Sequence, residues 1–340
     1  MKKILEKLIN FQNLSSEEMS LSMKLIMEGK ASPAQIASFL TALRMKGETI
    51  EEIASAARVM REKSLNIKVD LTPETPLIDT CGTGGDNKKT FNISTASAFV
   101  VAGTNLKVAK HGNRSISSQS GSADVLESLG IKIDLSPKSV VRCIQEVGIG
   151  FLFAPSLHPA MKYAISPRRE LGFRTIFNIL GPLTNPAGAN IQVLGVFDKK
   201  LLSTLVRVLK ELGSLAAMVV YGEGGYDEIT ITGKTYVSEL KNGCIKEYIL
   251  DPKDFGLSYG YPEDLEVNSP QESALIIEKI LSGKEKGPRR DMVVLNAAAA
   301  IYLSKNKDFK HSLEEAIQSI DRGKAWKKLQ ELRELSRHLT

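Results

Sequence analysis

The sequence predicts an α/β fold with a small N-terminal helical domain, residues 1–70, and a larger domain, residues 71–340, that contains a mostly parallel sheet. The first 65 of the 340 residues carry helix-start signals, whereas short apolar runs alternate with helical patterns from residue 77 onward. Such alternation is typical of parallel strands covered by helices on both faces. Residues 71–76 contain two prolines, which cannot continue a helix, and they are expected to link the two domains.

Helix starts in the first domain are marked by capping boxes. Ser15, Ser32 and Thr49 are each followed three residues later by Glu or Gln, and such pairs satisfy N–H groups that the first helical turn leaves free. Apolar residues recur at helical spacing in 4–9 and 36–43. We expect a bundle of about four short helices.

Short apolar runs are the expected strands of the second domain. They are residues 77–79, 106–109, 149–153, 191–196 and 216–221. Helical patterns lie near residues 94–103, 122–129, 137–147, 199–212, 270–282, 291–304 and 312–337. Ligands of open α/β sheets bind at the carboxyl ends of the strands, so the loops that follow these runs are the places to seek a site.

Composition excludes several classes of protein. A hydrophobic fraction of 42% and a charged fraction of 25% are globular values, and the net charge of +6 is spread along the chain rather than gathered in one patch. The most apolar run, residues 293–303, is shorter than the roughly 18 residues that a membrane span needs. The three cysteines, at positions 81, 143 and 244, are odd in number and lack paired spacing, which argues against a disulfide framework and a zinc site. We therefore expect a cytoplasmic protein that binds neither nucleic acid nor membranes.

A glycine-rich loop follows the first expected strand. Gly82, Gly84 and Gly85 stand within four positions, and their lack of side chains lets backbone N–H groups approach an anion closely. Ser94 and Thr95 then begin a helix, whose N-terminus favours negative charge. Neither a Rossmann fingerprint nor a P-loop is present, so this pattern indicates another type of phosphate site, with a plain glycine turn as the alternative.

A second polar loop follows the next strand, from Lys110 to Ser122. It holds two cations, Lys110 and Arg114, together with several hydroxyls. Lys and Arg donate charge-assisted hydrogen bonds to phosphate oxygens. Taken alone, this segment could be a polar loop with a serine helix cap, but two such loops on successive strands are expected to face one crevice.

Adjacent carboxylates, Asp227 and Glu228, follow the last of the expected strands in a glycine-rich loop. Magnesium is commonly held by one or two carboxylates plus phosphate oxygens and water. A solvated turn is the alternative for this pair taken alone, and Asp79 and Asp86 are further candidates for the same ion.

Four other side chains bear on chemistry. Arg168 can pair with a carboxylate substrate, and His111 and His158 are possible proton carriers. The alternative for Arg168 is a surface arginine on a helix, and the alternative for the two histidines is a role in fixing loops. Cys81 follows a strand, but nothing beyond a nearby helix start would lower its pKa, so we expect it to serve as a small packing residue.

Taken together, these motifs resemble the anthranilate phosphoribosyltransferases of tryptophan biosynthesis. The matching segments are 81–86, 110–115, 172–186 and the Asp227–Glu228 pair, and the resemblance covers nearly the whole chain. It implies the fold of the pyrimidine nucleoside phosphorylases, with a helical domain completed by a joining segment near residues 165–185 and used for a homodimer. It also implies transfer of the ribosyl phosphate of phosphoribosyl pyrophosphate (PRPP) to the amine of anthranilate, with Mg²⁺ as cofactor and release of pyrophosphate.

The resemblance also assigns roles to residues of this sequence. The implied PRPP contacts are Gly82, Gly85, Asp86, Thr90, Asn92, Ile93, Ser94, Thr95, Lys110, His111, Gly112, Asn113, Arg114, Ser115, Ile116, Ser117, Ser118 and Ser122. Gly82, Asn113 and Arg168 are implied for anthranilate. Ser94, Asp227 and Glu228 are implied for magnesium.

This reaction matches the polar groups found above. Loss of pyrophosphate from the ribose leaves oxocarbenium-like character, so the main catalytic task is to stabilise the charge of the leaving group. We expect Lys110, Arg114 and magnesium to do so, and His111 to take the proton after the neutral amine attacks. Two rival functions remain: a nucleoside phosphorylase on the same fold, and a nucleic-acid-binding protein, which would require a concentrated basic face.

Overall fold

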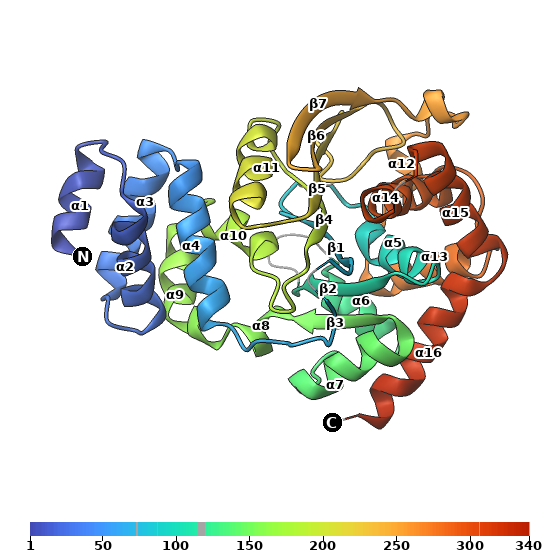
Figure 1. Cartoon of the computed structure of the whole chain (residues 1–340), viewed down its shortest axis with the longest axis horizontal. Coiled ribbons are helices and arrows are strands. Elements are labelled where there is room, and N and C mark those ends of the chain that lie inside the picture. Colours follow the sequence, from blue (N-terminus) through green and yellow to red (C-terminus); the bar gives the residue numbers. More distant parts are fainter. Residues whose placement is uncertain (73, 87, 115–119, 306, 340) are drawn as a thin grey trace.

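The computed structural model describes residues 1–72, 74–86, 88–114, 120–305 and 307–339, and it confirms the predicted fold class. Figure 1 shows the N-terminal helices at one end of the molecule, the sheet in the middle, and α5 (Ile93–Ala102) among the C-terminal helices at the other end. Among the described residues, no helix combines the length and the apolar character needed to cross a membrane.

The helical domain begins with α1 to α4. These helices are α1 (Lys2–Ile9), α2 (Ser16–Met27), α3 (Pro33–Lys46) and α4 (Ile50–Lys63). The capping boxes at Ser15, Ser32 and Thr49 are confirmed, with both hydrogen bonds present in each. Two later helices, α9 (Lys162–Leu171) and α10 (Phe177–Leu183), pack against α3 and α4 respectively. The domain boundary at residue 70 stays a prediction.

A buried ion pair fixes the turns of this bundle. Glu52 is fully buried and accepts hydrogen bonds from the Lys46 side chain and the Thr49 N–H, both at 2.8 Å, through one carboxylate oxygen. Its other oxygen accepts from the Leu14 N–H, also at 2.8 Å. One carboxylate therefore joins the α1–α2 connection to the α3–α4 turn, and a buried pair with these added hydrogen bonds is well satisfied.

In the described part of the chain, one sheet has seven strands in the order β3-β2-β1-β4-β5-β6-β7. The strands are β1 (Leu77–Gly82), β2 (Lys107–Gly112), β3 (Ile149–Phe153), β4 (Ile191–Gly195), β5 (Ala216–Gly222), β6 (Thr235–Lys241) and β7 (Cys244–Leu250). The first five strands run parallel to one another. β6 is antiparallel to β5, and β7 is antiparallel to β6.

The β6–β7 hairpin is absent from the sequence-based strand assignment. Its turn is Asn242–Gly243, where both residues have positive φ, which is the signature of a two-residue hairpin turn. This signal was available in the sequence, but β7 is mostly exposed, and Lys246 and Glu247 interrupt its apolar residues.

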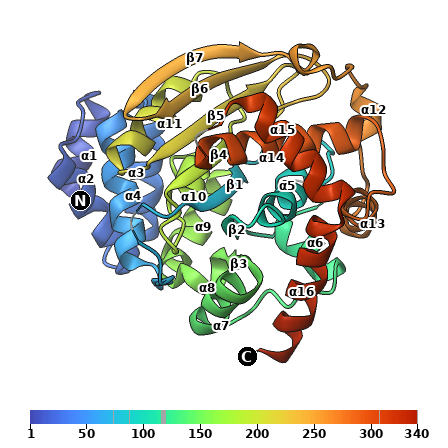
Figure 2. The same ribbon diagram turned by 45° about the vertical axis from the view of Figure 1, so that its right-hand side comes forward.

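Helices cover both faces of the sheet, as Figure 2 shows from a second angle. One face carries α5, α6 (Ser122–Ser128), α13 (Pro270–Leu281), α14 (Pro288–Ser304), α15 (Phe309–Asp321) and α16 (Lys324–His338), in one continuous hydrophobic cluster. The other face packs against α11 (Leu201–Glu211) and the helical domain in a second cluster. Shorter elements are α7 (Pro137–Arg142), which continues as a π-helix through Val147, α8 (Ala154–Leu157) and α12 (Pro262–Leu265).

The prediction of one helix over residues 312–337 is wrong. The chain forms α15 and α16 there, separated at Arg322–Gly323, where Gly323 has a φ of +68°. A left-handed residue ends a helix, and glycine adopts that conformation without the steric cost of a side chain.

Candidate active site

The glycine loop after β1 is held by the acidic loop after β5. The Gly84 N–H donates to Oδ2 of Asp227 at 2.8 Å. A Cβ at Gly82 would lie 2.5 Å from that same oxygen, and a Cβ at Gly195, at the end of β4, would overlap the Asp227 carbonyl oxygen. Glycine at the ends of β1 and β4 is therefore what lets Asp227 reach the carboxyl edge of the sheet.

Carboxylates gather at this edge. Burial, followed by the neighbouring Asp86, raises the pKa of Asp227 to about 7. Burial and then Asp227 raise the pKa of Glu228 above its ordinary value, and burial raises that of Asp86. Both Asp227 and Glu228 keep some solvent-exposed surface. Carboxylates crowded in this way favour a cation that neutralises them.

The N-terminus of α5 adjoins this cluster. The Ser94 N–H donates to Oε1 of Glu228 at 3.2 Å. The Lys110 ammonium, at the end of β2, lies 3.3 Å from the Ser94 hydroxyl and 2.6 Å from the carbonyl oxygen of Thr80. Lys110 is almost fully buried, and its charge acts to lower the pKa of Glu228. The structure therefore brings Ser94, Lys110 and Glu228 together.

The residues around α5 prepare an anion site. Asn92 exchanges hydrogen bonds with Ser120, at 2.7 and 3.2 Å, and so joins the start of α5 to the second polar loop. The Thr95 hydroxyl is buried and has no hydrogen-bond partner among the described residues. Thr90 pairs with Glu266 in an isolated β-bridge, and Ile93 is buried. An unpartnered hydroxyl in the first turn of a helix is suited to bind an anion.

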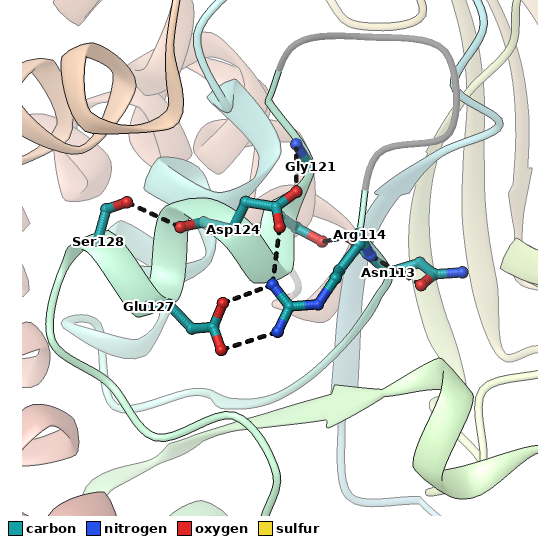
Figure 3. Close-up of polar contacts among 7 residues, drawn as sticks. Asn113, Arg114, Gly121, Asp124, Glu127 and Ser128 are labelled. Carbon is teal, nitrogen blue, oxygen red and sulfur yellow. Dashed lines mark hydrogen bonds and ion pairs between the residues drawn. The ribbon is translucent and has the colours of Figure 1, made fainter.

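Arg114 points toward α6, as Figure 3 shows. Its guanidinium donates to Asp124 at 2.8 Å and to both oxygens of Glu127 at 2.5 and 2.8 Å. Nearby, the Asn113 carbonyl oxygen accepts from the Ser122 hydroxyl at 3.2 Å. The charge of Arg114 is thus compensated inside the protein. The predicted PRPP contacts Ser115, Ile116, Ser117 and Ser118 lie outside the described residues.

A glycine at the end of β2 gives this loop room. A Cβ at Gly112 would collide with the Ser122 hydroxyl and lie 2.8 Å from the Phe151 ring.

Asp79 is fully buried in β1 and accepts hydrogen bonds from the His111 N–H at 3.2 Å and from the Asn185 amide at 2.9 Å. These bonds fix the end of β2. Because both carboxylate oxygens of Asp79 already accept hydrogen bonds in the protein interior, Asp79 is a weaker metal-binding candidate than Asp227 and Glu228.

Two buried imidazoles lie close together, one from His111 near the end of β2 and one from His158, which follows α8. The ring centroids of His111 and His158 lie 5.2 Å apart. Burial and then His158 lower the pKa of His111 to about 3, and burial lowers the pKa of His158 to about 4. Neither Nε2 has a hydrogen-bond partner among the described residues. Both rings are therefore neutral at pH 7, and a neutral imidazole can accept a proton.

Arg168 comes from α9, on the side of the helical domain. Its guanidinium lies 5.1 Å from the centroid of the Phe177 ring and forms no ion pair with any described residue. Burial lowers its pKa from the ordinary value, but an arginine stays protonated in proteins. It therefore offers a charged planar donor that a carboxylate can use.

Cys81 behaves as the predicted packing residue. It is buried and free, and burial followed by Asp79 raises the pKa of its thiol well above the usual value. Such a thiol is a poor nucleophile.

Sequence reasoning missed Gly195, Thr83 and Arg174. The Thr83 N–H donates to the Gly195 carbonyl oxygen at 2.9 Å, and Arg174 donates to the carbonyl oxygen of Gly85. For Gly195, the glycine near the end of the 191–196 run was a usable signal. The contact of Arg174 has no local signal, because it spans 89 residues.

The residues fit magnesium in one particular way. Among the described residues, no three or more His, Cys, Asp or Glu side chains are grouped so that they could hold a metal ion. Asp227 and Glu228 with the Ser94 hydroxyl would therefore share the ion with oxygens from the substrate and water, which is how Mg²⁺ is usually bound.

Comparison with known proteins agrees with this architecture. A family model described as "Glycosyl transferase family, a/b domain" matches residues 74–326, and one described as "Glycosyl transferase family, helical bundle domain" matches residues 2–64. The chain is 53% identical to the anthranilate phosphoribosyltransferase of Alkaliphilus metalliredigens, over 100% of this chain and 99% of the relative.

Solved structures are similar in the same way. The enzyme from Thermus thermophilus superimposes with a TM-score of 0.93 at 41% identity, covering 98% of this chain and 99% of its own. The Saccharomyces cerevisiae enzyme, solved in complex with PRPP and Mg, gives 0.89 at 30% identity, covering 99% and 98%. With a match over its full length and over both domains, the chain belongs to the anthranilate phosphoribosyltransferase family.

Proposed function

We propose that the protein transfers the 5-phosphoribosyl group of PRPP to the amine of anthranilate, giving N-(5-phosphoribosyl)anthranilate and pyrophosphate, as a step of tryptophan biosynthesis. The observation that carries this proposal is the meeting of a glycine loop, a helix N-terminus and an acidic pair through the Gly84–Asp227 and Ser94–Glu228 hydrogen bonds. A polyanion that binds together with a divalent cation needs these parts at one edge of a sheet.

The metal site is proposed at Asp227, Glu228 and Ser94. When bound, Mg²⁺ supplies positive charge that neutralises phosphate oxygens and favours the departure of pyrophosphate. The raised pKa of Asp227 makes this carboxyl ready to exchange a proton for a cation near pH 7. Asp86 adds negative charge from the glycine loop itself.

PRPP is proposed to lie between the two loops. Gly82, Gly85 and the first turn of α5 offer backbone N–H groups and hydroxyls, including the unpartnered Thr95 hydroxyl. Lys110 is buried beside Ser94 and is placed to stabilise charge on the leaving pyrophosphate. The remaining proposed contacts, apart from Arg114, are Asp86, Thr90, Asn92, Ile93, His111, Gly112, Asn113, Ser115, Ile116, Ser117, Ser118 and Ser122.

For Arg114 we propose a supporting part in binding PRPP. The sequence suggested a direct electrostatic role, but two carboxylates of α6 already neutralise the guanidinium. A paired arginine at this place ties the end of the described segment 88–114 to α6, the helix that carries Asp124 and Glu127.

Anthranilate is proposed to bind through its carboxylate to Arg168, with Gly82 and Asn113 also near it. The absence of an ion pair to Arg168 among the described residues leaves its donors available. The amine is neutral at pH 7 and needs no strong base to attack. We propose that His111 takes the proton released after attack through its Nε2, which is unpartnered among the described residues. With a pKa of about 3 this imidazole is a weak base, so it would hold the proton only in passing to solvent.

We also propose a cytoplasmic homodimer formed through the helical domain. Large apolar side chains are exposed on it at Ile9, Phe11, Leu21 and Met45, and exposed apolar groups mark a contact surface where they form one contiguous patch. The three cysteines are free, in keeping with a reducing compartment. Light scattering of the pure protein would test the dimer, and a monomeric mass would refute it.

A steady-state assay tests the reaction. Purified protein is mixed with anthranilate, PRPP and Mg²⁺, and the loss of anthranilate fluorescence is followed, with each component omitted in turn. Loss that requires all three components is the expected result. Folded protein that gives no loss would refute the proposal and leave the phosphorylase and nucleic-acid hypotheses, which phosphate-dependent nucleoside cleavage and salt-dependent binding of single strands would separate.

A further inference from the structure

The glycine loop after β1 has little conformational preference of its own. Gly84 and Gly85 both adopt positive φ, +65° and +75°, and consecutive glycines have access to many other conformations. Contacts from other elements must therefore select the observed one. Such contacts include three hydrogen bonds to its backbone: Asp227 accepts from the Gly84 N–H, Gly195 accepts from the Thr83 N–H, and Arg174 donates to the Gly85 carbonyl oxygen.

We propose that Arg174 is a positioning residue that fixes the glycine loop by its Gly85 end and ties it to the segment between α9 and α10. As a part in catalysis, this inference rests on the proposed function, because the loop is the proposed PRPP site. Arg174 itself touches neither the acidic pair nor the proposed anthranilate arginine through any hydrogen bond that the described residues show.

The side chain of Arg174 is held in place from two sides. Its guanidinium donates to the carbonyl oxygen of Gly85 and lies over the Phe197 ring, 4.0 Å from the centroid. An arginine stacked on an aromatic ring has its donor fork preorganised, so it loses less freedom for each hydrogen bond formed. It forms no ion pair with a described carboxylate, so the hydrogen bond to Gly85 is its main polar contact there.

Phe197 belongs to the same assembly. Its N–H donates to the Thr83 hydroxyl at 3.1 Å, so the residue under the guanidinium also anchors the first part of the glycine loop. The glycine loop is therefore held at two points. Arg174, from the segment between α9 and α10, binds Gly85, and Phe197, which follows β4, binds Thr83.

The placement of Gly85 explains why this contact bears on PRPP. Gly84, on one side, donates its N–H to Asp227, and Asp86, on the other, is the carboxyl that raises the pKa of Asp227. A turn of the Gly85 peptide would redirect both neighbours. The segment that carries Arg174 also follows α9, which carries Arg168, so the same contact links the proposed anthranilate side to the PRPP side.

The test compares Arg174→Ala, Arg174→Lys and Phe197→Leu with a matched control, Arg169→Ala. Arg169 is exposed on α9 and forms no hydrogen bond or ion pair with a described residue. Arg174→Ala is expected to raise the KM for PRPP at least tenfold and to raise the Mg²⁺ requirement, with a change below threefold in the KM for anthranilate. Arg174→Lys should fall between, because an ammonium can donate to Gly85 but cannot stack as a plane. Added guanidinium ion should restore part of the lost activity of Arg174→Ala.

A measurement that needs no substrate accompanies the kinetics. Hydrogen exchange of the amides in residues 82–86 should be faster in Arg174→Ala and Phe197→Leu than in the wild type and in Arg169→Ala. An unchanged exchange rate, or equal rises in the two KM values, would overturn the inference. A wild-type protein without activity would defeat the proposed function, while the exchange rates would still decide what Arg174 does. If Arg174→Ala does not fold, the same comparisons with Phe197→Leu decide the question.

Discussion

A methyl group at Gly82 should displace the Asp227 carboxylate. The added Cβ would lie 2.5 Å from Oδ2 of Asp227, whereas ordinary contacts begin near 3.4 Å, so the carboxylate has to shift by about 0.9 Å. A misplacement of this size can cost about 100-fold in rate. For Gly82→Ala we expect kcat/KM for PRPP to fall by about 10- to 100-fold, with activity partly recovered at high Mg²⁺. The assay is the fluorescence assay above, repeated across a Mg²⁺ titration.

Two further glycine variants make this result decisive. Because Gly82 itself is proposed to approach the substrates, a second variant should disturb Asp227 from elsewhere. Gly195→Ala does so from the end of β4, where the added Cβ would overlap the Asp227 carbonyl oxygen and lie 3.0 Å from the Asp227 Cα. Gly150→Ala in β3 is the matched control, because its Cβ would lie 2.7 Å from Ile144, far along the chain from the acidic loop. Wild-type Mg²⁺ titrations for folded Gly82→Ala and Gly195→Ala would refute the reasoning. So would an equal change in Gly150→Ala, which should lower only the unfolding temperature.

The other predictions concern the anthranilate, histidine and arginine contacts. Arg168→Ala should raise the KM for anthranilate by more than tenfold and change that for PRPP little; equal effects would count against a carboxylate anchor. The buried His111 and His158 have pKa values of about 3 and 4, against about 6.5 in the unfolded chain. The unfolded chain therefore binds more protons, and each histidine should cost about 2 kcal/mol of stability as the pH falls from 8 to 5. Thermal unfolding should show this loss, and His158→Gln should reduce it by about half. Glu127→Gln removes the negative charge of one of the two carboxylates that pair with Arg114, so the KM for PRPP should rise a few-fold. The unfolding temperature should barely change, because exposed ion pairs contribute little to stability. A large drop in the unfolding temperature would contradict this.

Much of the site could be predicted because it follows from topology. The carboxyl ends of parallel strands lie at one edge, so the loops after β1, β2 and β5 were expected at the same edge of the sheet. β4 separates β1 from β5, and the hydrogen bonds from Gly84 to Asp227 and from Ser94 to Glu228 form across its end, where Gly195 leaves room for Asp227. The residue types then indicated the ligand, because hydroxyls, glycines and carboxylates each have a narrow set of uses beside phosphates.

Side-chain partners could not be predicted in the same way. The sequence presents Arg114 as a free cation in a phosphate-binding loop, and only the packing of α6 shows that Asp124 and Glu127 already hold it. Similarly, nothing local marks Arg174 as a partner of Gly85. Such contacts depend on the relative placement of elements that are far apart in the sequence, and no periodic pattern encodes that placement.

The arrangement of charges in the site explains why it should bind an ion rather than stand complete without one. Lys110 could have neutralised the acidic pair, but its ammonium donates to the Thr80 carbonyl oxygen and the Ser94 hydroxyl and forms no ion pair with a described carboxylate. Burial therefore leaves Asp227 and Glu228 with raised pKa values, and their negative charge is costly in the free protein. A carboxylate pair already matched to a lysine would gain little from a divalent cation. The charges of Asp227, Glu228 and Lys110 are therefore not paired with one another, although each group has hydrogen-bond partners. A divalent cation can bind the two carboxylates and a polyanion can bind the ammonium, so the binding of one should reinforce the binding of the other.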